Sequence, residues 1–120
     1  MAKKRHENMP ENMPAKITVG PLAYDLTTYG DAWVEHPKAE PAEMYGYTDH
    51  ERGQILIHPN TTPQMRKVTT LHEVMHSVAF AAGQLDNRKR SEEDWVVMVA
   101  PLLLDTLKRN PALAAYLLAD

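Results

Sequence analysis

The chain lacks cysteine altogether, and it has few glycines, few aromatic residues and no long apolar run. Without cysteine, its 120 residues cannot form disulfides, thiolate nucleophiles, iron–sulfur clusters or any zinc site that needs Cys ligands. A metal ion would therefore have to bind His, Asp or Glu. The longest apolar run, 95–104, is about half of the roughly 20 residues that a membrane helix requires. We expect no membrane partner and, because no signal peptide opens the chain, a cytoplasmic location.

An excess of positive charge is also missing. Lys and Arg total 13 against 16 Asp and Glu, which gives a formal net charge of −3. Most nucleic-acid-binding proteins present a basic face to phosphate, so we expect no nucleic-acid partner. Hydrophobic residues make up 43% and charged residues 24% of the chain, which are ordinary values for a globular protein. The length is that of one domain.

The composition divides the chain into a tail and a domain. Residues 1–16 are polar and repeat the tetrapeptide Glu-Asn-Met-Pro at 7–10 and 11–14. Two close prolines and the absence of apolar periodicity predict a disordered N-terminal tail over 1–16. Apolar alternation begins at Ile17, so we place the folded domain at 17–120.

The first half of this domain has the pattern of a small sheet. Apolar residues alternate over 17–26 with a break at Gly20-Pro21, which predicts one strand with a bulge, and residues 30–43 have loop composition. A hairpin should follow over 44–57, where a polar turn at 48–53 leads to Ile55, Leu56 and Ile57. The pattern therefore predicts an α+β fold with a mostly antiparallel sheet of about three strands.

The second half has the pattern of helices. Thr62-Pro63 should begin a long helix over 63–82, with Gly83 as its C-terminal cap, and a polar loop should follow over 84–90. Ser91 should cap a second helix that extends to about Arg109 and kinks at Pro101. Asn110-Pro111 should begin a short final helix over 112–119.

The residues that carry chemistry lie in the long helix, where His72, Glu73 and His76 form the motif H-E-x-x-H. Residues four apart share one helix face with side chains about 5–6 Å apart, so both imidazoles can bind one metal ion. Glu73 lies beside this pair, where it can hydrogen-bond a water molecule as a general base. The spacing predicts a Zn2+ site with His72 and His76 as ligands.

A catalytic zinc ion needs a third protein ligand and an open position. The metzincin extension is absent because Ala79 and Ala82 replace its Gly and His. A carboxylate from the second helix is the natural choice, and Glu93 and Glu92 both share a face with apolar residues of that helix. The further candidates in the sequence are Asp86, Asp94, His50 and His58.

These residues resemble the ImmA/IrrE family of zincin-like metallopeptidases. The likeness covers about residues 17–120. It consists of a hairpin that ends at 55–57, followed by a segment, 66–71, that leads directly into the H-E-x-x-H motif. Short phage and prophage proteins of the family look similar over this range. The family's third ligand is the glutamate of E-x-x-A-N-x-F-A. Glu93 occupies that position and Val99-Ala100 fits the final pair, although Val96-Val97 replace the Ala-Asn pair. The resemblance implies a gluzincin-type site of His72, His76 and Glu93.

The resemblance further implies a zinc-dependent endopeptidase acting on a protein substrate, which in well-known members is a regulator of a mobile element or stress response. Glu73 would be the catalytic base, and a substrate strand could add to the sheet at 55–57. Four side chains could stabilise an oxyanion: His50, His58, Tyr47 and Tyr24. The alternative is a non-enzymatic phage or prophage protein, in which zinc is structural or the leucine-rich final helices form an interaction face.

Overall fold

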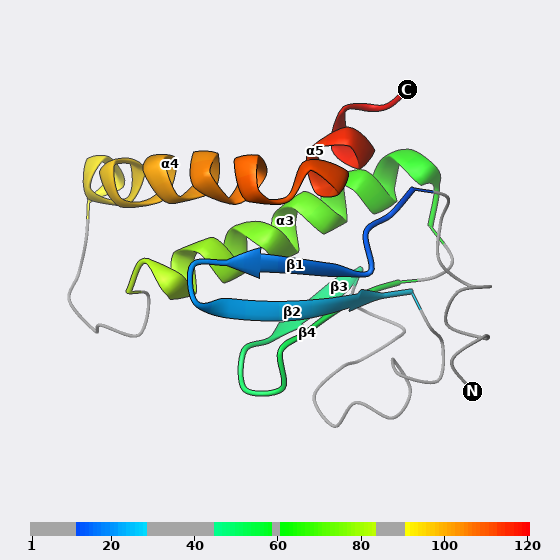
Figure 1. The fold of residues 1–120 in the computed structure, drawn as a ribbon, viewed down its shortest axis with the longest axis horizontal. Coiled ribbons are helices and arrows are strands. Elements are labelled where there is room, and N and C mark those ends of the chain that lie inside the picture. The colour runs from blue at the N-terminus through cyan, green and yellow to red at the C-terminus, as the bar shows by residue number, and fades with distance from the viewer. Residues whose placement is uncertain (1–11, 29–44, 59–60, 84–90) are drawn as a thin grey trace.

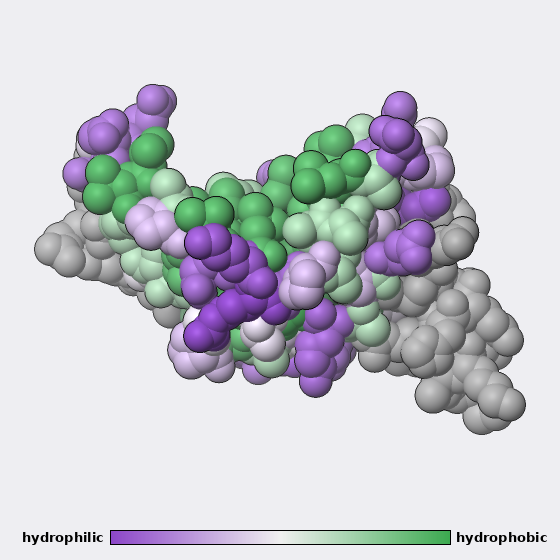
Figure 2. Space-filling model, turned by 45° about the horizontal axis from the view of Figure 1, so that its top comes forward, coloured by the Kyte–Doolittle hydropathy of each residue, from purple (hydrophilic) through white to green (hydrophobic). Residues whose placement is uncertain are grey.

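The computed structural model describes residues 12–28, 45–58, 61–83 and 91–120. In these ranges the elements are β1 (Lys16–Val19), β2 (Leu22–Thr27), β3 (Gly46–Asp49), β4 (Gln54–Ile57), α3 (Pro63–Ala81), α4 (Glu92–Arg109) and α5 (Pro111–Leu118). The α3 helix packs on the sheet, and α4 and α5 lie along α3, with α4 also reaching β1 (Figure 1). The expected α+β class is therefore confirmed. Apolar surface gathers on the face that α4 and α5 present to the viewer in Figure 2.

The sheet has four strands in the described residues, where we expected about three. Residues 17–26 do not form one bulged strand, because β1 and β2 pair as an antiparallel hairpin in which Val19 lies opposite Leu22. Gly20 has φ +57° and proline fixes φ of Pro21 near −65°, a combination that fits a two-residue II′ turn. Because this turn reverses the chain, the residues on either side of Gly20-Pro21 belong to two strands.

The order of the strands is β1-β2-β4-β3, and it overturns the expected position of the edge. The predicted hairpin over 44–57 is present as antiparallel β3 and β4, but β4 also pairs in parallel with β2. The sheet is therefore mixed, and 55–57 lies inside it rather than at its edge. Ile55, Leu56 and Ile57 are almost fully buried, and a continuous apolar run of this kind is typical of a strand that has a neighbour on each side and is covered on both faces. Among the described strands, β3 is the edge beside α3.

The helices begin and end close to the predicted residues. Thr62 accepts a hydrogen bond from the N–H of Met65, and Gly83 follows α3 with φ +107°. Ser91 and Asp94 form a reciprocal capping box at the start of α4, which continues through Pro101 to Arg109. Asn110 departs from its expected role. It precedes α5, but its side chain makes no capping hydrogen bond to that helix. The side chain instead bonds the backbone N–H and C=O of Thr18 in β1 at 2.9 and 2.8 Å, and its Nδ2 also donates to the carbonyl of Thr106 near the end of α4 at 2.7 Å.

The hydrophobic core lies between the sheet and the helices. It is built from apolar side chains of the strands, of α3 and of α5, including Ile17, Leu26, Val74 and Leu113. Of the expected N-terminal tail, residues 1–11 lie outside the described residues, whereas Met13 is buried in this core and Lys16 begins β1. The predicted loops over 30–43 and 84–90 lie outside the described residues. No helix within the described ranges is both long and apolar enough to cross a membrane.

Candidate metal centre

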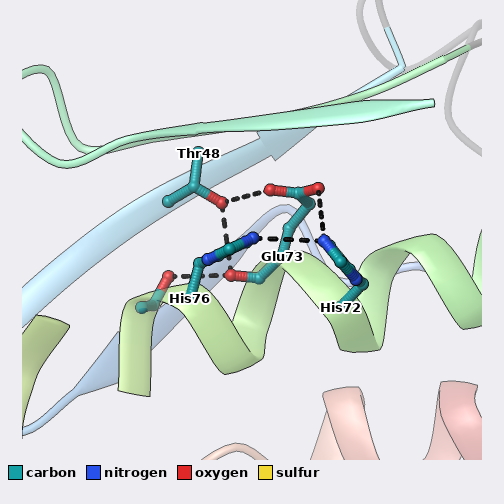
Figure 3. Close-up of polar contacts among 5 residues, drawn as sticks. Thr48, His72, Glu73 and His76 are labelled. Atoms are coloured by element: carbon teal, nitrogen blue, oxygen red, sulfur yellow. Dashed lines mark hydrogen bonds and ion pairs between the residues drawn. The ribbon is translucent and has the colours of Figure 1, made fainter. Parts of the chain in front are cut away.

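Two imidazoles meet on α3. His72 and His76 are one helical turn apart, and their Nε2 atoms are 3.1 Å from each other (Figure 3). Both side chains are exposed, and they lie beside the buried row of α3 that packs on the sheet. The geometry brings together two nitrogens that can act as metal ligands, as the H-E-x-x-H spacing predicts.

The separation of these nitrogens suits zinc. With Zn–N bonds of about 2.0–2.1 Å at a tetrahedral ion, two ligand nitrogens lie about 3.3 Å apart. The Nε2 atoms of His72 and His76 lie at nearly that distance without any change of helix geometry. The donor set also agrees with the metal, because imidazole nitrogen is a common zinc ligand. These two residues therefore fit the group that the motif implies.

The carboxylate of Glu73 lies beside the two imidazoles but is held differently. Glu73 is only 5% exposed, and its Oε1 accepts a hydrogen bond from Oγ1 of Thr48 on β3 at 2.7 Å. Its Oε2 is 4.0 Å from Nε2 of His72 (Figure 3). The carboxylate is thus anchored at one oxygen and directed toward the imidazoles with the other. This arrangement suits a base next to a metal better than a ligand.

Close contact between β3 and α3 creates this environment. A Cβ atom at Gly46 would lie 2.8 Å from Cγ2 of Thr69 and 3.0 Å from Cγ and Oε2 of Glu73. Real Cβ atoms do not come so near, so the strand can approach the helix only with glycine at this position. Gly46 and Thr48 are two residues apart on β3 and therefore share the face that meets Glu73.

A third histidine lies in the same cleft. The cleft has a volume of about 360 Å³ and is lined by Gly46, Tyr47, Thr48, His50, His72, Glu73 and His76. His50 follows β3, its ring stacks on Phe80 with centroids 4.0 Å apart, and its Nδ1 is 2.9 Å from the hydroxyl of Tyr24. Burial, and secondarily the nearby His76, lower the pKa of His50, while Asp49 opposes this shift.

The structure separates the four side chains that could stabilise an oxyanion. His50 and Tyr47 line the cleft. Tyr24 does not line it, but its hydroxyl is bonded to His50 and Ser77. Burial raises the pKa of Tyr24. His58 does not line the cleft, and its backbone N–H donates to the carbonyl of Tyr45.

Glu93 and Glu92 lie in the first turn of α4, and both are exposed. Within the described residues, no group of three or more His, Asp or Glu side chains is arranged to hold a metal ion. The structure therefore brings together His72, Glu73 and His76 but does not add Glu93 to them. Asp86 lies outside the described residues. The third ligand stays a prediction.

Sequence reasoning missed Thr48 and Gly46, the two residues of β3 that contact Glu73. Both stand in the segment predicted to be a hairpin, where threonine and glycine are ordinary. No local signal marks them, because their role comes from the way β3 packs on α3.

No protein-family model matches the chain, and comparisons with curated proteins and with solved structures give no significant match.

Proposed function

We propose that the protein is a zinc-dependent endopeptidase with a gluzincin-type H-E-x-x-H site, of the kind that the resemblance to the ImmA/IrrE family implies. One observation carries the proposal: the Nε2 atoms of His72 and His76 converge to 3.1 Å beside the buried, anchored carboxylate of Glu73, in an open cleft. A metal-binding pair and a base within reach of one another are the elements of metal-assisted hydrolysis.

In this proposal His72 and His76 hold Zn2+, and Glu93 is the third ligand by resemblance. The chemistry supplied by bound zinc is Lewis acidity, which makes a water molecule more acidic and polarises a peptide carbonyl. Glu73 accepts the proton of the attacking water at Oε2 and passes it to the departing amine nitrogen. Thr48 is a positioning residue, because its bond to Oε1 fixes the carboxylate and leaves Oε2 on the side of His72.

The polypeptide substrate would lie along β3. Strand addition to a sheet edge is a general mode of peptide binding, and in the described residues β3 is the edge that borders the cleft. His50 would then stabilise the oxyanion, since Tyr24 and Phe80 fix its ring in the wall of the cleft. Tyr47 is the second side chain of the wall that could donate a hydrogen bond.

The alternative, a non-enzymatic zinc protein, is less well supported by the geometry. A structural zinc site closes all four positions with protein ligands. Here the side chain of His72 is 64% exposed and the cleft above it is open, which leaves room for a substrate. The open cleft favours the enzyme.

The decisive experiment is Glu73→Gln. The variant should keep the zinc content of the wild type, measured by atomic absorption, and should lose hydrolysis of an unfolded, fluorescence-quenched casein by roughly 10²–10⁴-fold, because glutamine cannot accept the proton. Glu51→Gln removes the same charge from an exposed turn and should leave hydrolysis unchanged. Equal hydrolysis by wild type and Glu73→Gln would eliminate Glu73 as the base and the proposal with it.

A further inference from the structure

The apolar surface beside the cleft has no part in the mechanism above. Three exposed apolar side chains, Tyr45, Met65 and Val68, line a depression that shares Gly46, His72 and Glu73 with the cleft. We call these three side chains the apolar subsite. Apart from His72 and Glu73, none of the described residues that line the depression is charged. Covering exposed apolar side chains is favourable, so this surface is suited to an apolar ligand group.

The position of the apolar subsite on α3 relates it to the histidines. Met65, Val68, His72 and His76 are spaced by three, four and four residues, so they form one row along a single helix face. With a rise of 1.5 Å per residue, Val68 lies about 6 Å along the helix from His72. The side chains on one face of an extended peptide repeat about every 6.7 Å. A peptide that runs along this row would place every second side chain against it.

The backbone of β3 can hold such a peptide. The N–H of His58 donates to the carbonyl of Tyr45 at 2.7 Å, which makes Tyr45 and His58 a bonded pair of the antiparallel hairpin. Hydrogen-bonding direction alternates along a strand, so the backbone groups of Gly46 and Thr48 point away from β4. They therefore face the open edge of the described sheet, above the residues of the cleft.

The apolar surface continues beyond the subsite. Val68 also lines a second hollow, of about 400 Å³, between α3, α4 and α5. The other apolar side chains that line it, among the described residues, are Leu71, Leu103, Leu107, Ala114, Leu117 and Leu118. A charged residue, Lys67, also lines the hollow, and its Nζ donates to the carbonyl of Ala119. The chain of a bound polypeptide can thus pass from the cleft onto a continuous apolar surface.

We propose that the apolar subsite selects the substrate: a polypeptide segment in extended conformation with apolar side chains at alternate positions, paired with β3 and covering Tyr45, Met65 and Val68. This inference rests on the proposed peptidase function and names its substrate class. Such segments occur in unfolded proteins and in strands that have no pairing partner, and they differ from polar surface loops. Val68 is the specificity-determining residue because it belongs to both hollows.

The test measures binding separately from cleavage. Two labelled peptides with lysines at both ends, one alternating valine with threonine and one with serine in place of valine, are titrated by fluorescence anisotropy into zinc-loaded Glu73→Gln protein. The valine peptide should bind roughly tenfold more tightly, an effect of the size expected from covering one or two apolar side chains. Adding Val68→Lys should abolish this difference.

Val97→Lys is the matched control. Val97 on α4 is 62% exposed and Val68 on α3 is 63% exposed, but Val97 lines neither hollow. It should leave the preference for valine intact. Equal binding of the two peptides, or equal effects of the two lysine substitutions, would overturn the inference. So would sedimentation showing that Val68→Lys turns a dimer into a monomer, since the surface would then serve a second copy. If the valine peptide binds as expected but wild type cleaves no peptide, the peptidase function fails and the binding surface stands.

Discussion

The hydrogen bond from Thr48 to Glu73 allows a quantitative prediction. Thr48→Val replaces the hydroxyl with a methyl group of nearly the same size, so it removes the 2.7 Å bond to Oε1 without opening a cavity. Glu73 is 5% exposed, and water cannot easily replace the lost donor. Hydrogen bonds to charged groups contribute about 1.5–3 kcal/mol, and an acceptor left unsatisfied costs a similar amount. We expect the variant to lose about 1.5–3 kcal/mol of unfolding free energy.

The assay is urea unfolding of the chelator-treated protein, so that metal binding does not contribute to stability. Thr48→Ser keeps the hydroxyl and is the matched control, for which we expect a loss below about 1 kcal/mol. Turnover should follow the same order, because the valine variant leaves the Glu73 carboxylate without its anchor. A valine variant within about 0.5 kcal/mol of the wild type, or a serine variant as unstable as the valine variant, would refute the reasoning.

Three further predictions concern the same region. Gly46→Ala should lower the free energy of unfolding by roughly 1–3 kcal/mol and reduce hydrolysis, because the new Cβ would collide with Thr69 and Glu73. Gly20→Ala is the control: its Cβ would meet open space at φ +57°, so it should lower the free energy of unfolding by about 1 kcal/mol and leave hydrolysis unchanged. Similar hydrolysis by both variants would contradict this prediction. Burial lowers the pKa of His50, so the unfolded chain binds a proton at this residue more readily than the folded chain does. The contribution of His50 to the stability of the metal-free protein should therefore be full above about pH 6.5 and fall as the pH drops below that value. His50→Gln should flatten this fall, and a pH profile that the substitution leaves unchanged would contradict the prediction. Zinc content should collapse in Glu93→Ala and survive in Glu92→Ala, and the opposite result would make Glu92 the third ligand.

The limits of helix prediction follow from the range of the interactions involved. Thr62, Gly83 and Ser91 act on backbone groups only a few residues away, so their types and spacing predict where α3 begins and ends and where α4 begins. Asn110 has the same local signal, yet its side chain bonds Thr18, a residue 92 positions away. A competing partner so distant in the sequence cannot be inferred from the neighbourhood of Asn110.

The sheet was predicted less completely, for a related reason. The β3–β4 hairpin follows from a polar turn between two apolar segments, which is a local pattern. The parallel pairing of β2 with β4 joins segments that are not adjacent in the chain, and no local signal marks it. Because of this pairing, 55–57 lies in the interior of the sheet rather than at its edge, and β3 is the edge strand beside the cleft.

By itself the amino-acid sequence determined how the residues of the H-E-x-x-H motif are placed, since the helical repeat alone puts His72 and His76 on one face with Glu73 beside them. It also excluded thiolate ligands, because the chain has no cysteine. Only the tertiary structure decided what surrounds them: Thr48 anchors Glu73, Gly46 allows β3 to approach, and Tyr24 and Phe80 fix the ring of His50. Those contacts arise where strands and helix meet, and packing between distant segments is a property of the folded chain as a whole.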